Sequence, residues 1–319
     1  MIDQMLERYD LLLTIEVRAF WLIAGLYAIS LLLHIAHALA HPFYYAKERR
    51  LESAAGTEGV RVHESGQLFF GQAAAALLFF TVIVQGLLFI LRSYERGTCP
   101  IQTRYEGYQL FAWIATLTYL FVRRRWAHIY MPGLLVNLIA LAAMLAVPAS
   151  NGLTPDPAPL PANMRVSWYV WYIGAAFAAY GVLAVSFAIE LSCLGARIIH
   201  AAHLFRDETR PLVENPLFHR DAYKLALFAF PVLTLAILAG AAWTASVWGH
   251  LWTWEYVKTA SPVTWIAFGL YLHAKHLRRW RGALASLFNI LGFISIVIVF
   301  AGPRFLAGLV GLSGLYPPG

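Results

Sequence analysis

The sequence predicts an all-α polytopic membrane protein with about eight transmembrane helices. Of its 319 residues, 60% are hydrophobic and only 13% are charged. Soluble domains usually carry about one quarter charged residues. Several apolar runs reach the roughly 20 residues that a helix needs to cross the hydrocarbon of a bilayer. The charged residues gather in short segments between these runs, which disfavours a large soluble α-helical protein.

The first apolar run follows a segment of different character. In residues 1–18, Leu, Ile and Val are interleaved with Asp, Glu and Arg, which is typical of an amphipathic helix lying on a membrane surface. The acidic start is not typical of a cleavable signal peptide. We therefore divide the chain into an N-terminal amphipathic segment, 1–18, and a transmembrane domain, 19–319.

Eight apolar segments are predicted to span the membrane, and turn-forming or charged residues end several of them. Pro42 follows the first segment, three arginines beginning at Arg123 follow the third, and a Pro-rich stretch follows the fourth. The third is short unless it begins near Tyr105. Residues 197–224 place apolar residues at helical spacing among charges, and we expect a helical surface segment there. The predicted spans are 19–41, 68–91, 110–122, 129–147, 166–194, 225–247, 263–276 and 283–301.

Most of the lysines and arginines lie in the loops after the odd-numbered spans, which predicts that these loops are cytoplasmic. Both termini then lie on the outer side. Arg92, Arg96 and Arg104 are an exception, because they lie in an outward loop. They either neutralise an anionic ligand or pair with Glu95 and Glu106.

Four of the 11 tryptophans fall within residues 243–254, between the sixth and seventh spans: Trp243, Trp248, Trp252 and Trp254. Tryptophan anchors helices at membrane surfaces, but one or two on each side are enough for that purpose. Four in one outward connection indicate a partly hydrated aromatic shelf that suits a large planar ligand.

Titratable residues inside spans are costly and are functional candidates for that reason. His34, His37 and His41 share one face of the first span, and His273 and His276 lie in the seventh. Counting residues from the outer side places His273 at a depth similar to His34 or His37. Two imidazoles from different helices suit the axial positions of a haem iron, whereas zinc needs three or four ligands. A hydrogen bond between helices is the alternative for each histidine alone, and His41 and His276 are expected at the membrane surface.

Several functional classes lack the motifs that they need. The sequence has no Gly-rich phosphate loop, no GxSxG or HExxH, and no CxxC around Cys99 or Cys193. No catalytic residue is therefore predicted. No acidic residue in the middle of a span has a predicted basic partner, which gives little support to a proton-relay transporter. The net charge of +7 lies mostly in loops, so no nucleic acid is expected as a partner.

The motifs together resemble one family of membrane proteins. WGHLWTWE (248–255) resembles a Trp-rich WGxxWxWD signature, and TWIAFGLYLHAK (264–275) resembles the following span with its histidine, here His273. FPVLTLAILAGAAW (230–243) and GTCPIQTRYEGYQLFAW (97–113) resemble the span before the signature and an earlier loop. In this order they are similar to the CcsA (ResC) type of cytochrome c biogenesis protein.

The resemblance implies delivery of haem b across the bacterial cytoplasmic (inner) membrane. The outward Trp-rich stretch would present haem to an apocytochrome c, together with a ResB/CcsB-type membrane partner and membrane lipid. The iron would be held by His273 and one of His34 and His37. Such a chain is a component of a cytochrome c haem lyase complex rather than an enzyme with its own nucleophile. The residues implied in haem binding also include Trp243, Trp248, Gly249, Trp252, Trp254 and Glu255.

The sequence departs from the family pattern at two outward histidines. Where the family has a segment like MHVS, this chain has Met164-Arg165-Val166-Ser167, and its C-terminal tail lacks the second histidine. Arg165 is then a candidate partner for a haem propionate, and His250 a candidate outward ligand. Two alternatives stay open: a HemX-like regulator or structural subunit that binds haem without outward ligands, and a transporter or scaffold without haem.

Overall fold

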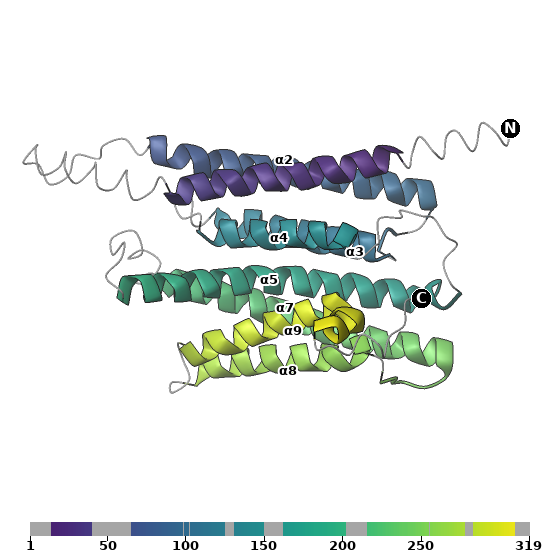
Figure 1. Cartoon of the computed structure of the whole chain (residues 1–319). Coiled ribbons are helices and arrows are strands. Elements are labelled where there is room, and N and C mark those ends of the chain that lie inside the picture. Colours follow the sequence, from purple (N-terminus) through teal and green to yellow (C-terminus); the bar gives the residue numbers. More distant parts are fainter. Residues whose placement is uncertain are drawn as a thin grey trace, which may run out of the picture. The chain divides into compact units, whose positions relative to one another are not determined.

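The computed structural model describes residues 14–39, 65–97, 99–101, 103–124, 131–149, 162–201, 216–254, 256–277 and 283–309. These residues fold into helices joined by short connections, which confirms the predicted all-α class (Figure 1). The helices are the first helix (Thr14–Leu39), α2 (Ser65–Arg96), α3 (Arg104–Arg123), α4 (Met131–Ala149), the 3-10 turn η1 (Ala162–Met164), α5 (Ser167–Ala201), α7 (Pro216–Trp248), α8 (Tyr256–His276) and α9 (Ala283–Leu309).

The helices lie where the apolar runs predict them, and most are longer than those runs. The first helix already includes residues 14–18, so the end of the predicted amphipathic segment continues into the first span. The third helix begins at Arg104, close to the predicted longer alternative at Tyr105. The predicted surface segment 197–224 is partly wrong, because α7 begins at Pro216 and runs without a break to Trp248.

Four described segments are long and apolar enough to cross a membrane: Thr14–Leu39, Phe69–Glu95, Ser167–Ile198 and His219–Trp248. Met131–Val147 and Leu284–Phe300 are shorter apolar helices. The protein is therefore a polytopic membrane protein, as predicted. Many large apolar side chains on these helices are exposed, for example Leu32 and Ile90, as expected for surfaces that face lipid.

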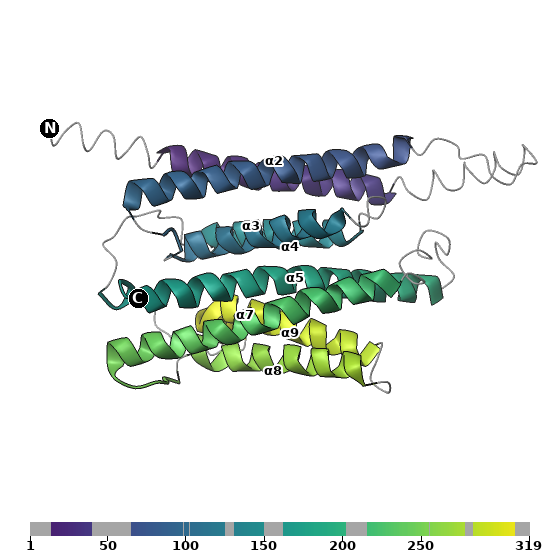
Figure 2. The ribbon, with the colours of Figure 1, turned by 180° about the vertical axis from the view of Figure 1, so that it is seen from behind.

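The chain divides into two compact units. Unit 1 comprises Met1–Pro159 with Gly195–Pro216, and unit 2 comprises Leu160–Leu194 with Leu217–Gly319. The first helix and α2 to α4 form unit 1, and α5, α7, α8 and α9 form most of unit 2 (Figures 1 and 2). Within unit 2, α8 and α9 pack closely against each other.

Hydrogen bonds between helices hold the interior of unit 1. The Tyr27 hydroxyl lies 3.0 Å from Gln85 Oε1 and 3.1 Å from Thr116 Oγ1, which joins three helices. Gln85 also donates to the Gln109 carbonyl at 2.9 Å, and Ser30 donates to the Ala74 carbonyl at 3.0 Å. Such bonds are important between membrane helices, because lipid gives no hydrophobic force that drives helix faces together.

A buried arginine connects the first helix, α2 and α3 at one end of unit 1. Arg92 Nε donates to Glu106 Oε1 at 2.7 Å, and Arg92 Nη1 pairs with Glu16. Glu106 also caps α3 reciprocally with Thr103, in a capping box. Of the two sequence-based interpretations of this loop, pairing with Glu106 therefore applies to Arg92, so that arginine has a structural role.

We expect Arg92→Met to lower the free energy of unfolding by about 3–5 kcal/mol, because it leaves two buried carboxylates without their cation. Thermal unfolding of the purified protein in detergent measures this loss. Glu95→Gln is the matched control, since Glu95 is exposed near the same end of α2 and its change should stay within about 0.5 kcal/mol. Equal melting temperatures for Arg92→Met and the control would contradict a structural role for Arg92.

Candidate functional site

The Trp-rich stretch begins inside the core of unit 2. Trp243, on the last turns of α7, is buried and stacks on Tyr172 of α5 with ring centroids 5.9 Å apart and an interplanar angle of 12°. Tyr169 packs on the same indole at 5.2 Å. The Trp243 N–H donates to the Asn163 carbonyl at 2.7 Å. The first tryptophan of the stretch is therefore a support that fixes η1 and the start of α5 against α7.

Gly249 ends α7 and turns the chain. Its φ of +76° lies in the left-handed region, which glycine adopts without a steric penalty, and its N–H donates to the Ala245 carbonyl at 3.0 Å. This is a helix C-cap, and it explains why the signature has a glycine after Trp248. The turn exposes the residues that follow it, including His250 and Leu251.

The other tryptophans of the stretch present open surface. Trp248 is 41% exposed and Trp254 is 84% exposed. Trp248 meets Trp243 edge-on at 5.1 Å, and Trp252 meets Trp254 edge-on at 6.3 Å. We call Trp248, Trp252 and Trp254 the tryptophan shelf. Trp243 lies beneath it, so the four tryptophans divide into one support and three shelf residues.

A lysine that the sequence analysis missed lies beneath this shelf. The Lys258 ammonium lies 4.7 Å from the ring centroids of both Trp243 and Trp248, and it donates to Thr253 Oγ1 at 2.8 Å. Lys258 is only 6% exposed. It therefore joins the end of α7, the turn after it and the first turns of α8 through two cation–π contacts and a hydrogen bond.

Arg165 and Glu255 are the remaining predicted residues of this region. Arg165 is exposed, and its neighbours Met164 and Val166 pack on the cluster around Trp243. Arg165 thus lies next to the support of the shelf. Glu255 lies outside the described residues.

The two histidines predicted as inner ligands are buried in unit 1. His34 Nδ1 lies 2.9 Å from the Ser30 carbonyl, whereas its buried Nε2 has no hydrogen-bond partner among the described residues. That nitrogen faces α4 where Gly133 allows a close approach, because a Cβ at Gly133 would lie 2.7 Å from His34 Nε2. His37 is also buried, one turn further along the helix.

His273 belongs to unit 2 and is exposed, whereas His34 and His37 are buried. It is exposed on α8, in a row of exposed apolar side chains that includes Ile266 and Leu270. Because His34 and His37 belong to unit 1, the pairing of His273 with either of them stays a prediction.

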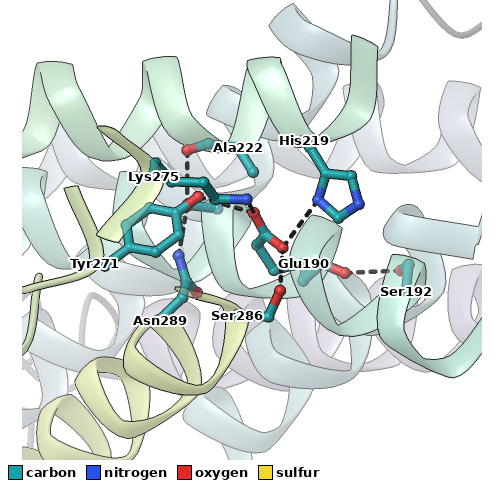
Figure 3. A network of polar contacts seen from close by, with 10 residues as sticks. Glu190, Ser192, His219, Ala222, Tyr271, Lys275, Ser286 and Asn289 are labelled. Carbon is teal, nitrogen blue, oxygen red and sulfur yellow. Dashed lines mark hydrogen bonds and ion pairs between the residues drawn. The ribbon is translucent and has the colours of Figure 1, made fainter. Parts of the chain in front are cut away.

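Unit 2 also contains a charged network that the sequence analysis excluded. Glu190, on α5, is fully buried and receives the Lys275 ammonium of α8 at 2.6 Å (Figure 3). His219 Nδ1 of α7 lies 3.1 Å from its other oxygen. The expectation that no acidic residue within a span has a basic partner is therefore wrong. The partners are 29 and 85 residues away in sequence, so no local pattern brings them together.

Two hydroxyl groups also donate hydrogen bonds to this carboxylate. Tyr271 donates to Glu190 Oε1 at 2.9 Å and Ser286 to Oε2 at 2.8 Å. Nearby, Asn289 donates to Ser186, which donates to the Ala222 carbonyl. The network joins α5, α7, α8 and α9, as Figure 3 shows.

With this geometry described, similarity to known proteins identifies the family. A family model described as cytochrome C assembly protein matches residues 71–310, which is most of the chain. The chain belongs to the cytochrome c assembly protein family. The matched region contains the tryptophan shelf, Lys258, His273 and the Glu190 network, whereas His34 and His37 precede it.

Members of this family from cyanobacteria are similar over most of their length. The cytochrome c biogenesis protein CcsA of Synechococcus sp. (strain CC9605) is 28% identical over 265 residues, which cover 74% of this chain and 86% of the relative. The CcsA of Prochlorococcus marinus (strain AS9601) is 23% identical over 267 residues, which cover 76% and 85%.

A solved structure shares the fold. The cytochrome c heme lyase CcmF matches with a TM-score of 0.60 and 17% sequence identity, covering 94% of this chain and 50% of CcmF. The cytochrome c assembly chain described here thus spans about half the length of CcmF. At this identity the match shows a common fold only.

The residues of unit 2 fit haem, the ligand implied by the sequence resemblance, in three respects. The exposed rings of Trp248 and Trp254 offer apolar aromatic surface for a porphyrin. Lys258 places positive charge next to the Trp248 ring, and Arg165 is exposed in the segment that packs on the Trp243 cluster, so both are candidate partners for the propionates. His273 offers an exposed imidazole.

We expect Trp243→Ala to lower the free energy of unfolding by about 3–5 kcal/mol, because it empties a packed aromatic site and leaves the Asn163 carbonyl without its donor. Trp254→Ala should change it by less than about 0.5 kcal/mol, because that ring is mostly exposed. Thermal unfolding of both variants tests the division into support and shelf. Similar losses in both variants would contradict it.

Proposed function

We propose that this protein binds haem b and presents it at the outer surface of the bacterial cytoplasmic membrane for cytochrome c maturation. The observation that carries this proposal is the exposed tryptophan shelf, built over Lys258, in a chain of the cytochrome c assembly family. The relatives named cytochrome c biogenesis protein CcsA and the structural neighbour named cytochrome c heme lyase support the same direction.

At the shelf, the indoles of Trp248, Trp252 and Trp254 would contact the porphyrin by ring face or ring edge, and Lys258 and Arg165 would attract its propionates. Gly249 keeps the turn that exposes these rings. His250 lies exposed on that turn and is the candidate outward ligand. Glu255 completes the signature. When bound, haem supplies the vinyl groups that react with the apocytochrome thiols, so the chain needs no nucleophile of its own.

Within the membrane, His273 and one of His34 and His37 would hold the iron. The two candidates of the first helix differ in their surroundings. His34 has one ring nitrogen on the Ser30 carbonyl and the other against α4 at Gly133, so iron binding there requires its ring to move. His37 is buried one turn further along the helix and stays the alternative inner ligand.

The proposed complex includes a ResB/CcsB-type membrane protein, with apocytochrome c as its client. Its Trp-rich stretch and both termini would face outward, as the distribution of basic residues indicates. In such a complex the chain is one component of a cytochrome c haem lyase.

One observation favours a second candidate function. Arg165 stands in the segment where the family pattern has an outward histidine, between Met164 and Val166, which pack on the cluster around Trp243. A chain without that ligand is suited to bind haem in the membrane without passing it on, as a HemX-like regulator or a structural subunit.

We expect the protein purified from membranes to show the Soret and α bands of a low-spin b-type haem. His273→Ala should remove most of this absorption, because it deletes an axial ligand. A visible spectrum of equal amounts of both proteins measures the difference. His276→Ala is the matched control, since His276 is exposed on the same helix one turn away.

The double variant His34→Ala/His37→Ala should lose the same bands, while each single variant identifies the inner ligand. An unchanged spectrum in the double variant would contradict the first helix as the source of that ligand. A Soret band without complementation of cytochrome c assembly would support the second candidate function. Absence of any Soret band would support a scaffold or transporter without haem.

We expect Trp248→Ala/Trp254→Ala to impair cytochrome c assembly in cells while leaving the membrane haem spectrum intact, because the shelf acts at the outer surface. Haem staining of c-type cytochromes measures assembly. Trp21→Ala, which removes a half-exposed indole from the first helix, is the control and should assemble normally. Normal assembly in the shelf variant would overturn the role given to the shelf.

A further inference from the structure

The Glu190 carboxylate divides its two oxygens between different helices. Among the described residues, Oε1 receives two groups of α8, Lys275 Nζ at 2.6 Å and the Tyr271 hydroxyl at 2.9 Å. Oε2 receives His219 of α7 and Ser286 of α9. One oxygen therefore binds α8 at two points, and the other binds the neighbouring helices (Figure 3).

The two contacts on α8 fix its rotation about its own axis. Tyr271 and Lys275 are four residues apart and lie on one helix face. His273 is two residues from each, which places it about 200° around the helix. Holding Tyr271 and Lys275 against Glu190 thus turns His273 away from the interior of unit 2, where it is exposed.

The two faces of α8 are distinct over residues 260–277. The inner face of α8 carries buried polar side chains. One of them, Thr264, accepts a hydrogen bond from Ser295 of α9 at 2.9 Å. The outer face has a row of apolar residues at alternating spacings of three and four, in which His273 is the only polar member. The row is Val263, Ile266, Leu270, His273 and Leu277.

The charge of Glu190 is what keeps Lys275 on the inner face. An ammonium inside an apolar bundle is costly unless a carboxylate pairs with it, and an unpaired lysine near the end of a span extends toward water. If Glu190 were neutral, Lys275 would leave the interior. A rotation of α8 about its axis would move Lys275 out of the interior. Because Lys275 and His273 lie on opposite faces of α8, the same rotation would carry the His273 imidazole inward.

We propose that Glu190 is a positioning residue that presents His273 for iron ligation, by fixing the rotation of α8 through Lys275 and Tyr271. The identity of the ligand rests on the proposed function, whereas the rotation of α8 does not. We therefore expect the contacts of Glu190 with α8 to determine the orientation of His273, and its contact with α9 to have no effect on it.

The first experiment compares haem binding in three variants of the full chain. Glu190→Gln keeps the shape of the side chain but removes the charge, and we expect about a tenfold loss of haem affinity, the lower end of the loss when a group that orients a metal ligand is removed. Tyr271→Phe removes one contact to α8 and should cause a smaller loss with altered low-spin EPR g-values. Ser286→Ala removes a contact to α9 from the same carboxylate and should bind haem normally.

The second experiment follows α8 without haem. After replacement of both native cysteines, Cys99→Ser and Cys193→Ala, a spin label on His273→Cys reports oxygen accessibility in lipid nanodiscs. The label should be accessible in this background and should lose most of that accessibility when Glu190→Gln is added. A label on Leu284→Cys, exposed on α9, is the matched control and should not change.

The outcomes separate this inference from the proposed function. Loss of accessibility at position 273 but not at 284 supports the inference even if the protein binds no haem, a result that would refute the proposed function alone. Equal haem loss in Ser286→Ala and Glu190→Gln, or an unchanged label at 273, overturns the inference. If Glu190→Gln does not fold, Tyr271→Phe takes its place in both experiments. A smaller loss of haem affinity and of accessibility at His273→Cys then supports the inference, and no change in either overturns it.

Discussion

A buried lysine and a half-buried lysine hold α8, and the described features of unit 2 depend on them. At one end, the Lys258 ammonium contacts the rings of both Trp243 and Trp248 and donates a hydrogen bond to Thr253. Toward the other end, Lys275 pairs with Glu190. They are 17 residues apart, and at about 1.5 Å per residue this separation approaches the hydrocarbon thickness of a bilayer. Each ammonium lies next to its partners, Trp243, Trp248 and Thr253 for Lys258 and Glu190 for Lys275. A rotation of α8 about its axis would move both ammonium groups away from these partners.

This constraint links the surface shelf to the interior of the membrane. Trp248 and the turn after it contact Lys258, so the position of α8 determines where the shelf residues lie. The same helix carries His273. A change in the rotation of α8 would therefore disturb the shelf and the histidine together, although they lie near different ends of one span. The polar side chains on its inner face also make α8 less apolar than the four long segments that could cross a membrane.

The length and spacing of apolar runs were enough to predict the helices, because crossing a membrane requires them. They predicted the part of α7 from residue 225 onward, whereas Gly249 was expected from the family resemblance. They did not predict that Trp243 is buried whereas Trp254 is exposed, because this depends on the packing of Tyr172 from α5. A signal for these two lysines does exist in the sequence. On α8, Lys258, Ser261, Thr264 and Lys275 recur at spacings that share one face, a polar stripe that a membrane helix turns inward.

The Glu190 network lay beyond any local pattern, since its members come from four helices. The positions of His34 and His37 before the matched family region have a further consequence. The shelf, Lys258, Glu190 and His273 all belong to unit 2, so this unit contains the features that fit haem and that the family match covers. In the proposed function, the first helix would contribute the second axial ligand. If a partner protein supplied that ligand instead, the role of Glu190 in orienting His273 would be unchanged, because every contact in that argument lies within unit 2.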